Sequence, residues 1–206
     1  MDTNKDAELV FEFTRDPAML GQFYRIYENE FKAVLKADYH HDDGDEHDRD
    51  GHFLIGRRGN NCVGGARLSV KTPQHPDLLP IEMGDFRIEN YFPHLGQKQM
   101  RYGQIGRLCL LPEFRGGAIT RTMFWHFFRK VVALDLDVIF ATAPLVIARG
   151  HMRHFVAMGL TEAKIHHDIT LPLYPMCEEI RFYLVSVVVD KSLIRNSESG
   201  AQQRAS

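Results

Sequence analysis

The amino-acid sequence predicts a single domain of the α+β or α/β class, built around a mixed sheet. Three observations favour this class. Several strand-like segments occupy the first half of the chain, one strand–helix–strand unit stands in the middle, and further strands follow it. The 206 residues suffice for one substantial core but are short for two domains. With 44% hydrophobic and 25% charged residues, the composition is that of an ordinary globular protein.

Periodicity indicates the elements of the first half. Residues 9–13 alternate in polarity, as a strand does. Residues 38–50 are acidic and histidine-rich and are predicted to form a loop. Two strands, over residues 52–57 and 62–70, flank a sequence suited to a hairpin turn. Between the first strand and the loop, a helix begins near Pro17, and its apolar residues share one face: Leu20, Phe23, Tyr24, Tyr27, Phe31 and Leu35.

The second half contains the central strand and the longest helix. Residues 71–80 hold three prolines and predict a loop, which a short amphipathic segment over residues 86–92 follows. A strand over residues 100–111 leads into a helix that starts at Ala118. Gly159 ends a later helix, because glycine is a common helix stop. The other elements expected here are strands over residues 138–143, 165–171 and 182–189 and a helix over residues 147–158.

Charge, hydropathy and cysteine usage exclude several classes of protein. A net charge of −2 gives no general electrostatic reason to expect nucleic-acid binding. No segment approaches the about 18 apolar residues of a membrane span, and the acidic N-terminus lacks a signal peptide's apolar run. Cys62, Cys109 and Cys177 are widely spaced, which favours a reducing cytoplasm over a disulfide framework. We expect the domain to cover residues 1–194 and residues 195–206 to form a disordered tail.

The most informative segment covers residues 104–120. It predicts a buried strand, a Pro-Glu-Phe turn, a basic glycine-bearing loop and the start of the long helix. A helix start offers unpaired backbone N–H groups and the positive end of the helix dipole to an anion. Arg115 adds positive charge, and Gly116 and Gly117 permit unusual torsions and close approach of a ligand. The anion that suits this arrangement is a phosphate group.

The run from Arg115 to Thr120 resembles the acyl-carrier phosphate loop of the GNAT-type N-acetyltransferases, and residues 141–144 and 154–160 resemble the second half of that fold. Two of the usual loop glycines are replaced here. The resemblance implies an α/β/α sandwich whose central sheet is mostly antiparallel, with a strand N–H group that stabilises the oxyanion. The donor-binding residues that it implies are Leu108, Leu110, Arg115, Gly116, Gly117, Ala118, Ile119 and Thr120.

Short motifs further upstream occur in a specific order. An arginine and a phenylalanine stand in the first helix, followed by an acidic cluster, a Gly-x-x-Arg-Leu strand and a Gly-Arg-Leu segment. This order resembles the acyl-homoserine lactone synthases, the LuxI-type branch of the GNAT fold, with Asp43 where that family has glutamate. The resemblance implies a polar set that orders the N-terminal region around S-adenosylmethionine and places its amine. Its members here are Arg25, Asp45, Asp48, Arg67 and Arg107.

The sequence departs from that family at three places. The tryptophan that follows the early phenylalanine is absent, and the chain's one tryptophan is Trp125 in the later helix. The Pro-Thr pair after the arginine strand becomes residues 69–73. Gln104 replaces the glutamate of the central strand, and an amide cannot take up a proton. We keep Gln104 in the catalytic set and name Asp48, Glu82, Glu113 or a water as the candidate base.

Together these resemblances imply an N-acyltransferase. It would move an acyl group from a phosphopantetheine thioester, on acyl-carrier protein or coenzyme A, to a small amine. S-adenosylmethionine is the acceptor that the lactone-synthase resemblance implies, and no tightly bound cofactor or metal is expected. The alternative enzyme is an N-acyl amino acid synthase of the same fold. An alternative of a different class is a non-catalytic sensor that binds acyl thioesters.

Three features allow a plainer interpretation. Residues 40–52 contain metal-ligand residue types, but their spacing matches no known metal loop, so a solvated acidic loop or an ordered substrate-side loop is favoured. The paired arginines and aspartates can be catalytic or only structural. His151 and His154 are spaced to share a ligand, although such a pair is more often an exposed polar edge. The phenylalanine-rich helix over residues 122–128 can line an acyl tunnel or form core.

Overall fold

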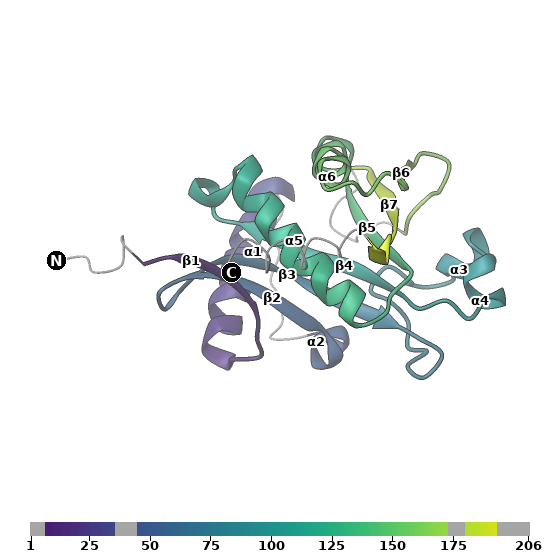
Figure 1. Ribbon diagram of the computed structural model, residues 1–206, viewed down its shortest axis with the longest axis horizontal. Helices are drawn as coiled ribbons and strands as arrows, with labels where there is room; N and C mark the ends of the chain where they lie inside the picture. The colour runs from purple at the N-terminus through teal and green to yellow at the C-terminus, as the bar shows by residue number, and fades with distance from the viewer. Residues whose placement is uncertain (1–6, 36–44, 173–179, 193–206) are drawn as a thin grey trace.

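The computed structural model describes residues 7–35, 45–172 and 180–192. Within them, seven strands form one mixed sheet in the order β1-β2-β3-β4-β5-β7-β6, with helices on both sides (Figure 1). This confirms the predicted α+β sandwich with a mostly antiparallel sheet. The strands are β1 (Leu9–Phe13), β2 (His52–Arg58), β3 (Asn61–Lys71), β4 (Tyr102–Leu110), β5 (Val138–Pro144), β6 (Ala163–His166) and β7 (Phe182–Val188).

The helices connect these strands and differ widely in length. The three long ones are α1 (Pro17–Leu35), α5 (Gly117–Ala133) and α6 (Leu145–Ala157). The short ones are α2 (Glu46–Asp50), α3 (Ile88–Tyr91), α4 (His94–Gln97) and the single 3₁₀ turn Pro112–Phe114. No helix of the described part is long and apolar enough to cross a membrane. The predicted tail over residues 195–206 lies outside the described residues, so the boundary at residue 194 stays a prediction.

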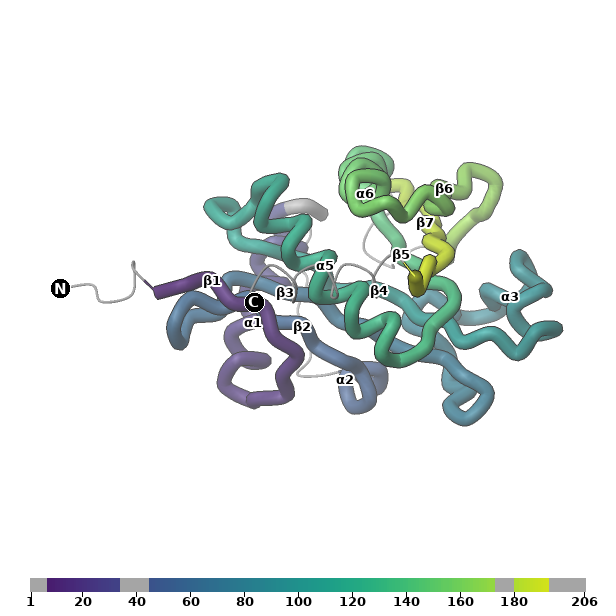
Figure 2. The backbone as a smooth tube through the Cα atoms, viewed as in Figure 1, coloured from purple at the N-terminus to yellow at the C-terminus, as the bar shows by residue number. Residues whose placement is uncertain are grey.

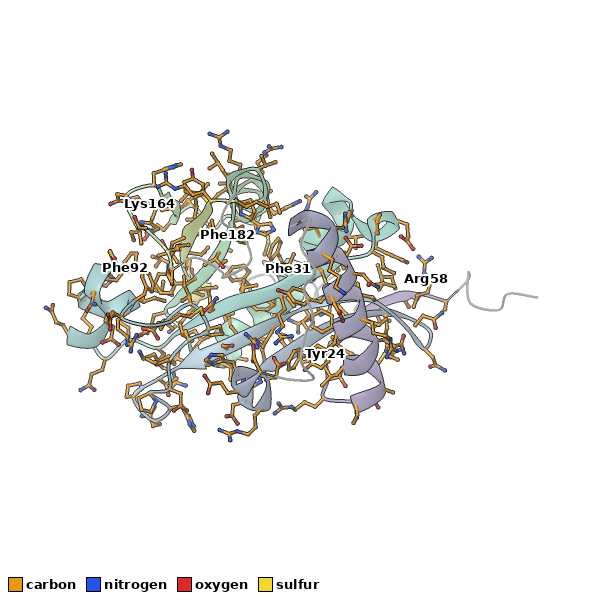
Figure 3. The ribbon with its side chains drawn as sticks, turned by 180° about the vertical axis from the view of Figure 1, so that it is seen from behind. Tyr24, Phe31, Arg58, Phe92, Lys164 and Phe182 are labelled. Atoms are coloured by element: carbon orange, nitrogen blue, oxygen red, sulfur yellow. The ribbon has the colours of Figure 1, made fainter. Side chains whose placement is uncertain are left out.

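Helices cover both faces of the sheet. α1 packs on β3 and β4, whereas α5 packs on β1 and β2 and also contacts α6. Figures 1 and 3 show α1 and α5 on opposite sides of the strands, and Figure 2 traces the chain from β1 at one edge to β6 at the other. Alternate residues of β2 supply both cores, because successive strand side chains point to opposite faces. Phe53 and Ile55 pack under α1, and Leu54 packs under α5.

β4 and β5 are parallel neighbours along only part of their length. Their pairing runs from Tyr102 opposite Val138 to Ile105 opposite Ala141, and then the strands part. On its other edge, β4 changes register with β3 across Gly65 and Arg67, which places a bulge in β4. As a result, residues 106–110 have no strand partner on the β5 side among the described residues. Backbone groups of a central strand are therefore available to a ligand.

Most predicted elements are confirmed, and the differences have local causes. α2 occupies part of the predicted acidic loop, because Asp45 and Asp48 form a capping box that starts a short helix. β6 ends at His166, earlier than expected, since β7 pairs with β6 only as far as Leu184. α4 was not predicted. Gly159 does end α6, with a φ of 84°, and Leu160 N–H bonds to the Phe155 carbonyl at 2.9 Å.

Candidate active site

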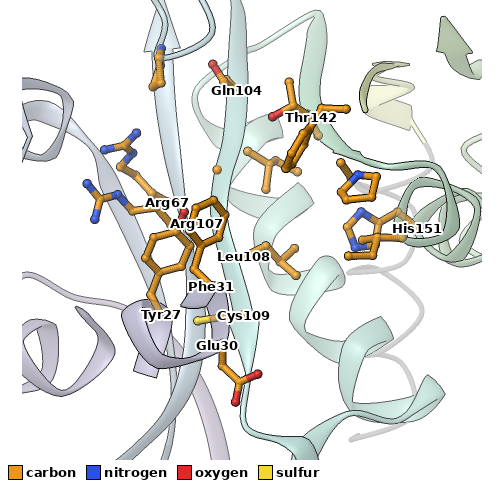
Figure 4. A pocket seen from close by; sticks show the side chains of 18 of the residues that line it. Tyr27, Glu30, Phe31, Arg67, Gln104, Arg107, Leu108, Cys109, Thr142 and His151 are labelled. Carbon is orange, nitrogen blue, oxygen red and sulfur yellow. The ribbon is translucent and has the colours of Figure 1, made fainter. Parts of the chain in front are cut away.

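A cavity of about 720 Å³ lies where β4 and β5 part (Figure 4). α1 and the start of α2 line one end of it, and α5, α6 and β5 line the other. The first end carries charged side chains and the second is mainly apolar. Residues of the polar end are Tyr27, Phe31, Asp45, Glu46, His47, Arg67, Gln104 and Arg107, and residues of the apolar end include Leu108, Phe124, Ile147, His151 and Phe155.

Four side chains of the predicted catalytic set form one ion-pair network at the polar end. Arg67 donates to Asp45 Oδ1 at 2.6 Å and to Asp48 Oδ1 at 2.5 Å. Arg107 donates to Asp45 Oδ2 at 2.8 Å, and its Nη2 lies 3.1 Å from Asp48 Oδ2. Each carboxylate therefore bridges both guanidinium groups. The two charges of each sign cancel, which is what permits burial of the arginines.

The backbone and the aromatic side chains of α1 hold this network in place. Arg107 lies in the β4 bulge with a φ of 53°, a backbone conformation that is uncommon for a non-glycine residue. Its guanidinium lies over the rings of Tyr24 and Tyr27, 5.4 Å and 5.6 Å from their centroids. Burial is the main effect that raises the pKa of Tyr24, to about 12, and the nearby Asp48 carboxylate adds to it, so the phenol stays protonated.

The two carboxylates differ in exposure. Asp48 is buried behind the cavity wall, whereas Asp45 lines the cavity and has 42% of its side chain exposed. Burial alone would raise the pKa of Asp45, but Arg67 and Arg107 outweigh it and hold the pKa below its usual value. Asp45 is thus an ionised acceptor facing the cavity. It can bind an amine or ammonium group, whereas Asp48 acts through the arginines.

Arg25 does not join the network. It lies exposed on α1, and it is absent from the cavity wall. Of the five charged residues that the family resemblance implies, four meet in space, and Arg25 is the one that stays apart. Asp43, expected in place of the family's glutamate, lies outside the described residues.

Gln104 lines the cavity and also supports a loop. The side chain is 2% exposed, and its Oε1 accepts a hydrogen bond from the Ile81 N–H at 2.9 Å. The amide therefore fixes the chain beside Pro80 and Met83, which line the same end of the cavity. Gln104 positions the wall but accepts no proton.

Two of the candidate bases lie elsewhere. Glu82 is buried away from the cavity, where its oxygens accept from the N–H groups of Leu79 (2.9 Å) and Ile88 (3.1 Å) and pair with Lys71. Glu113 is exposed on the 3₁₀ turn and does not line the cavity. His47, which sequence reasoning did not single out, does line it. The signal for His47 was its place inside the acidic cluster that the arginines bind.

The predicted phosphate loop forms the start of α5. No side chain of the described residues caps this helix, and the first intrahelical bond runs from Thr120 N–H to the Gly116 carbonyl at 2.9 Å. A Cβ atom added at Gly116 or Gly117 would meet nothing within 4 Å, so there is open space above the helix start. The torsional part of the prediction was wrong, because Gly116 is extended (φ −159°), a conformation open to any residue. The room for close approach is present.

The residues predicted to bind the acyl donor fall into two groups. Leu108, Leu110, Arg115 and Thr120 line the cavity, whereas Gly116, Gly117, Ala118 and Ile119 lie beside it at the helix start. Arg115 donates to the Leu110 carbonyl at 2.8 Å and pairs with Glu30 of α1, another cavity residue.

His151 is the residue of the apolar end that sequence reasoning missed. The sequence favours an exposed polar edge over a shared ligand site for His151 and His154, yet His151 lines the cavity, and its ring lies 5.3 Å from that of Phe124 in an edge-on arrangement. Burial is the main effect that lowers the pKa of His151, to about 4, and the neighbouring His154 adds to it, so the imidazole is neutral near pH 7. The available signal was spacing, because Ile147, His151 and Phe155 recur every four residues and share one face of α6.

Family comparison identifies the domain. The acetyltransferase (GNAT) domain model matches residues 23–125, half of the chain, and the match includes the greater part of α1, the Arg–Asp network and the start of α5. The chain belongs to the GNAT acetyltransferase family. This GNAT domain is accordingly an acyltransferase. No curated protein sequence matches it.

Solved structures share the GNAT fold at low sequence identity. FeeM, an N-acyl amino acid synthase from uncultured soil microbes, superposes with a TM-score of 0.61 at 11% identity, over 92% of this chain and 94% of FeeM. BjaI, a CoA-dependent acyl-homoserine lactone synthase solved with SAM and isopentyl-CoA, gives 0.58 at 16% identity, over 87% and 80%. The AHL synthase LasI gives 0.56 at 12% identity, over 88% and 90%. These likenesses establish the fold alone.

The GNAT site contains no recognisable metal centre in the part of the chain that the structure describes. No group of three or more His, Cys, Asp or Glu side chains there is placed to hold a metal ion. Part of the histidine-rich run over residues 40–52 lies outside the described residues. Within the described part, Asp45 and Asp48 bind arginines, which agrees with the substrate-side interpretation of that run.

Proposed function

We propose that this GNAT domain transfers an acyl group from a phosphopantetheine thioester to a small amine, in the manner of an acyl-homoserine lactone synthase that uses S-adenosylmethionine. The observation that carries the proposal is a single cavity with two chemically different ends. One end reaches the uncapped start of α5 and an apolar chamber, and the other reaches the Arg–Asp network. A donor with a phosphate and an apolar acyl chain suits the first end, and a cationic amine suits the second.

The donor would bind from α5 toward the gap between β4 and β5. Its phosphate would accept hydrogen bonds from the free N–H groups of residues 117–119, where the helix dipole favours an anion. The thioester would lie between the parted strands. There a backbone N–H near Leu108 or Leu110 would donate to the carbonyl oxygen as it becomes negative in the tetrahedral intermediate.

The acceptor would lie against α1 and the Arg–Asp network. Asp45 would bind and orient the amine, and the rings of Tyr27 and Phe31 would exclude water around it. The amine must lose a proton to become nucleophilic, and His47 or a water beside it would take that proton. The amine nitrogen then bonds to the carbonyl carbon, the thioester carbon–sulfur bond breaks, and the departing thiolate takes up a proton. The lactone would close when the carboxylate oxygen of the acylated S-adenosylmethionine bonds to its γ carbon and the bond from that carbon to the sulfonium sulfur breaks, which releases methylthioadenosine. Holding both substrates in one cavity supplies much of the acceleration.

A second candidate is an N-acyl amino acid synthase. Gln104 favours it, because a neutral amide stands where the lactone-synthase resemblance implies a glutamate, and its oxygen is occupied by the Ile81 N–H. The absence of the family's early tryptophan points the same way. Both candidates use the same donor end and differ only in the amine.

A coupled assay on the purified full chain tests the proposal. Octanoyl-CoA and octanoyl-carrier protein would each be incubated with S-adenosylmethionine or with a panel of amino acids, and thiol release and product mass would be measured. Acyl-homoserine lactone from S-adenosylmethionine is the expected result. Product from an amino acid but never from S-adenosylmethionine would support the second candidate. Saturable donor binding without thiol release for any amine would overturn both and favour a sensor.

A matched pair of variants links the chemistry to the site. Asp45→Asn removes the carboxylate that faces the cavity, whereas Arg25→Gln changes the exposed arginine outside it. We expect the first to lower kcat/KM for the amine at least tenfold and the second to leave it within about twofold. Equal losses in the two variants would contradict the assignment of the acceptor to this network.

A further inference from the structure

The apolar end of the cavity contains a hydrogen-bonding group that the transfer chemistry does not use. We propose that His151 determines donor specificity by hydrogen-bonding a polar substituent on the acyl chain, so that the preferred donor is an acyl thioester whose chain carries a hydroxyl or keto oxygen. The inference rests on the proposed function, because it assigns this end of the cavity to the acyl chain.

The surroundings of His151 make it distinctive. It extends from α6 into a chamber where Leu108, Phe124 and Phe155 also line the wall (Figure 4). The Phe124 ring lies edge-on at 5.3 Å, and the Phe155 ring lies 6.4 Å away. Among the described residues, no hydrogen bond reaches either ring nitrogen, so the contacts of His151 are with rings. A methionine or leucine would fill this place without introducing a polar atom.

The protonation state defines the ligand chemistry. Because burial keeps the ring uncharged near neutral pH, it presents one N–H donor and one nitrogen acceptor. A keto oxygen can accept from the N–H, and a hydroxyl can use either nitrogen. A carboxylate would require a charged partner, and the apolar walls offer none. The chemistry therefore favours an uncharged oxygen on the chain.

The expected discrimination follows from desolvation. A saturated alkyl chain would displace water from the imidazole and leave it without a partner, whereas an oxygenated chain would replace the water. Leaving such a group unpaired in a closed site corresponds to roughly a 10-fold to 100-fold loss of affinity. Thr142 of β5 also lines the cavity, and its hydroxyl can add to the effect but lies on a different wall.

The test measures donor binding calorimetrically with no amine present, so that it does not depend on the acceptor. The probes are octanoyl-CoA and its β-hydroxy, β-keto and ω-hydroxy derivatives, each with the full chain. The variants are His151→Phe, which keeps an aromatic ring, and His151→Gln, which keeps a donor and an acceptor. The matched control is His154→Phe, since His154 contacts Phe124 from the same helix but does not line the cavity.

We expect the wild type to bind at least one oxygenated donor 10-fold to 100-fold more tightly than octanoyl-CoA. His151→Phe should bring the donors within about threefold of each other and bind octanoyl-CoA more tightly, while His151→Gln retains part of the preference and His154→Phe all of it. A wild type without preference, or a preference that survives in a folded His151→Phe, overturns the inference. If His151→Phe does not fold, the wild-type and His151→Gln preferences decide. Thiol release by the same wild-type sample, with amines added, tests the proposed function separately.

Discussion

The two aspartates of the ion-pair network should separate stability from activity. Asp48→Asn keeps the shape of the side chain and removes its charge, which leaves Arg67 and Arg107 to share Asp45. The side chains of Arg67, Arg107 and Asp48 are only 3%, 6% and 6% exposed, so water cannot replace the lost charge. Asp45→Asn removes the same charge at a position that is 42% exposed and faces the cavity.

The magnitudes follow from these exposures. Removing one partner of a buried ion pair costs about 3–5 kcal/mol, because the remaining charge stays buried without compensation. Solvent screening reduces the effect at Asp45 to about 1–2 kcal/mol. With a urea m-value of about 3 kcal/mol/M, the upper value for small proteins, the midpoint should fall by about 1–1.7 M in Asp48→Asn and by less than about 0.7 M in Asp45→Asn.

Urea unfolding, followed by circular dichroism, measures the stability term, and acyl transfer at a temperature where both variants are folded measures activity. We expect Asp48→Asn to lose more stability and Asp45→Asn to lose more activity. An Asp45→Asn variant at least as destabilised as Asp48→Asn would refute the burial argument. A folded Asp48→Asn that is the less active of the two would refute the division of roles.

Three further outcomes are expected. Gly117→Glu should raise the free energy of unfolding by about 0.5 kcal/mol, because a negative charge is favourable at a helix N-terminus. It should also raise the KM of the donor, because the carboxylate would repel the donor phosphate. A lower KM would contradict a phosphate site at this helix start. Gly65→Ala should lower the free energy of unfolding, measured in urea, by about 3 kcal/mol, because a Cβ atom would lie 2.2 Å from the Leu54 carbonyl oxygen. Gly106→Ala is the control and should cost much less, because a Cβ atom there would meet open space. Equal losses in the two variants would be inconsistent with this packing. Acidification from pH 7 to about pH 5 should destabilise the wild type by about 2 kcal/mol more than His151→Phe. Burial lowers the pKa of His151 from 6.5 to about 4, so only the unfolded chain binds a proton at this histidine in that pH range. Identical pH dependence of the two proteins would show that His151 is not buried as described.

Local patterns predicted the framework well, because they depend on neighbouring residues. Alternation over residues 9–13, which form β1, and the helical spacing of apolar residues in α1 are properties of the elements themselves. Gly159 marks the end of α6 for the same reason, since its torsion completes a local hydrogen-bond pattern. The elements that were missed or misjudged are short. α2 needs its capping box, and the end of β6 depends on how far β7 extends beside it.

The same distinction between local pattern and tertiary packing applies to the candidate site. Motif order alone brought Asp45, Asp48, Arg67 and Arg107 into one predicted set, and the structure joins these four by ion pairs. It could not separate Arg25 from them, because that arginine shares a helix with Tyr24 and Tyr27 and only the orientation of α1 turns it outward. The difference between Asp45 and Asp48 is likewise one of burial. Burial depends on which elements pack together, and a linear pattern does not contain it.

By itself, then, the sequence determined the class of fold, the basic loop before α5 and the charged residues that would have to pair. Tertiary structure decided where these meet: in a cavity created because β4 and β5 part beyond Ile105 and because a bulge turns Arg107 toward Asp45. It also moved His151 from an expected surface edge to the cavity wall. The physical reason is that charge and hydrophobicity are properties of a residue, whereas exposure, partners and pKa arise only when distant segments are packed against one another.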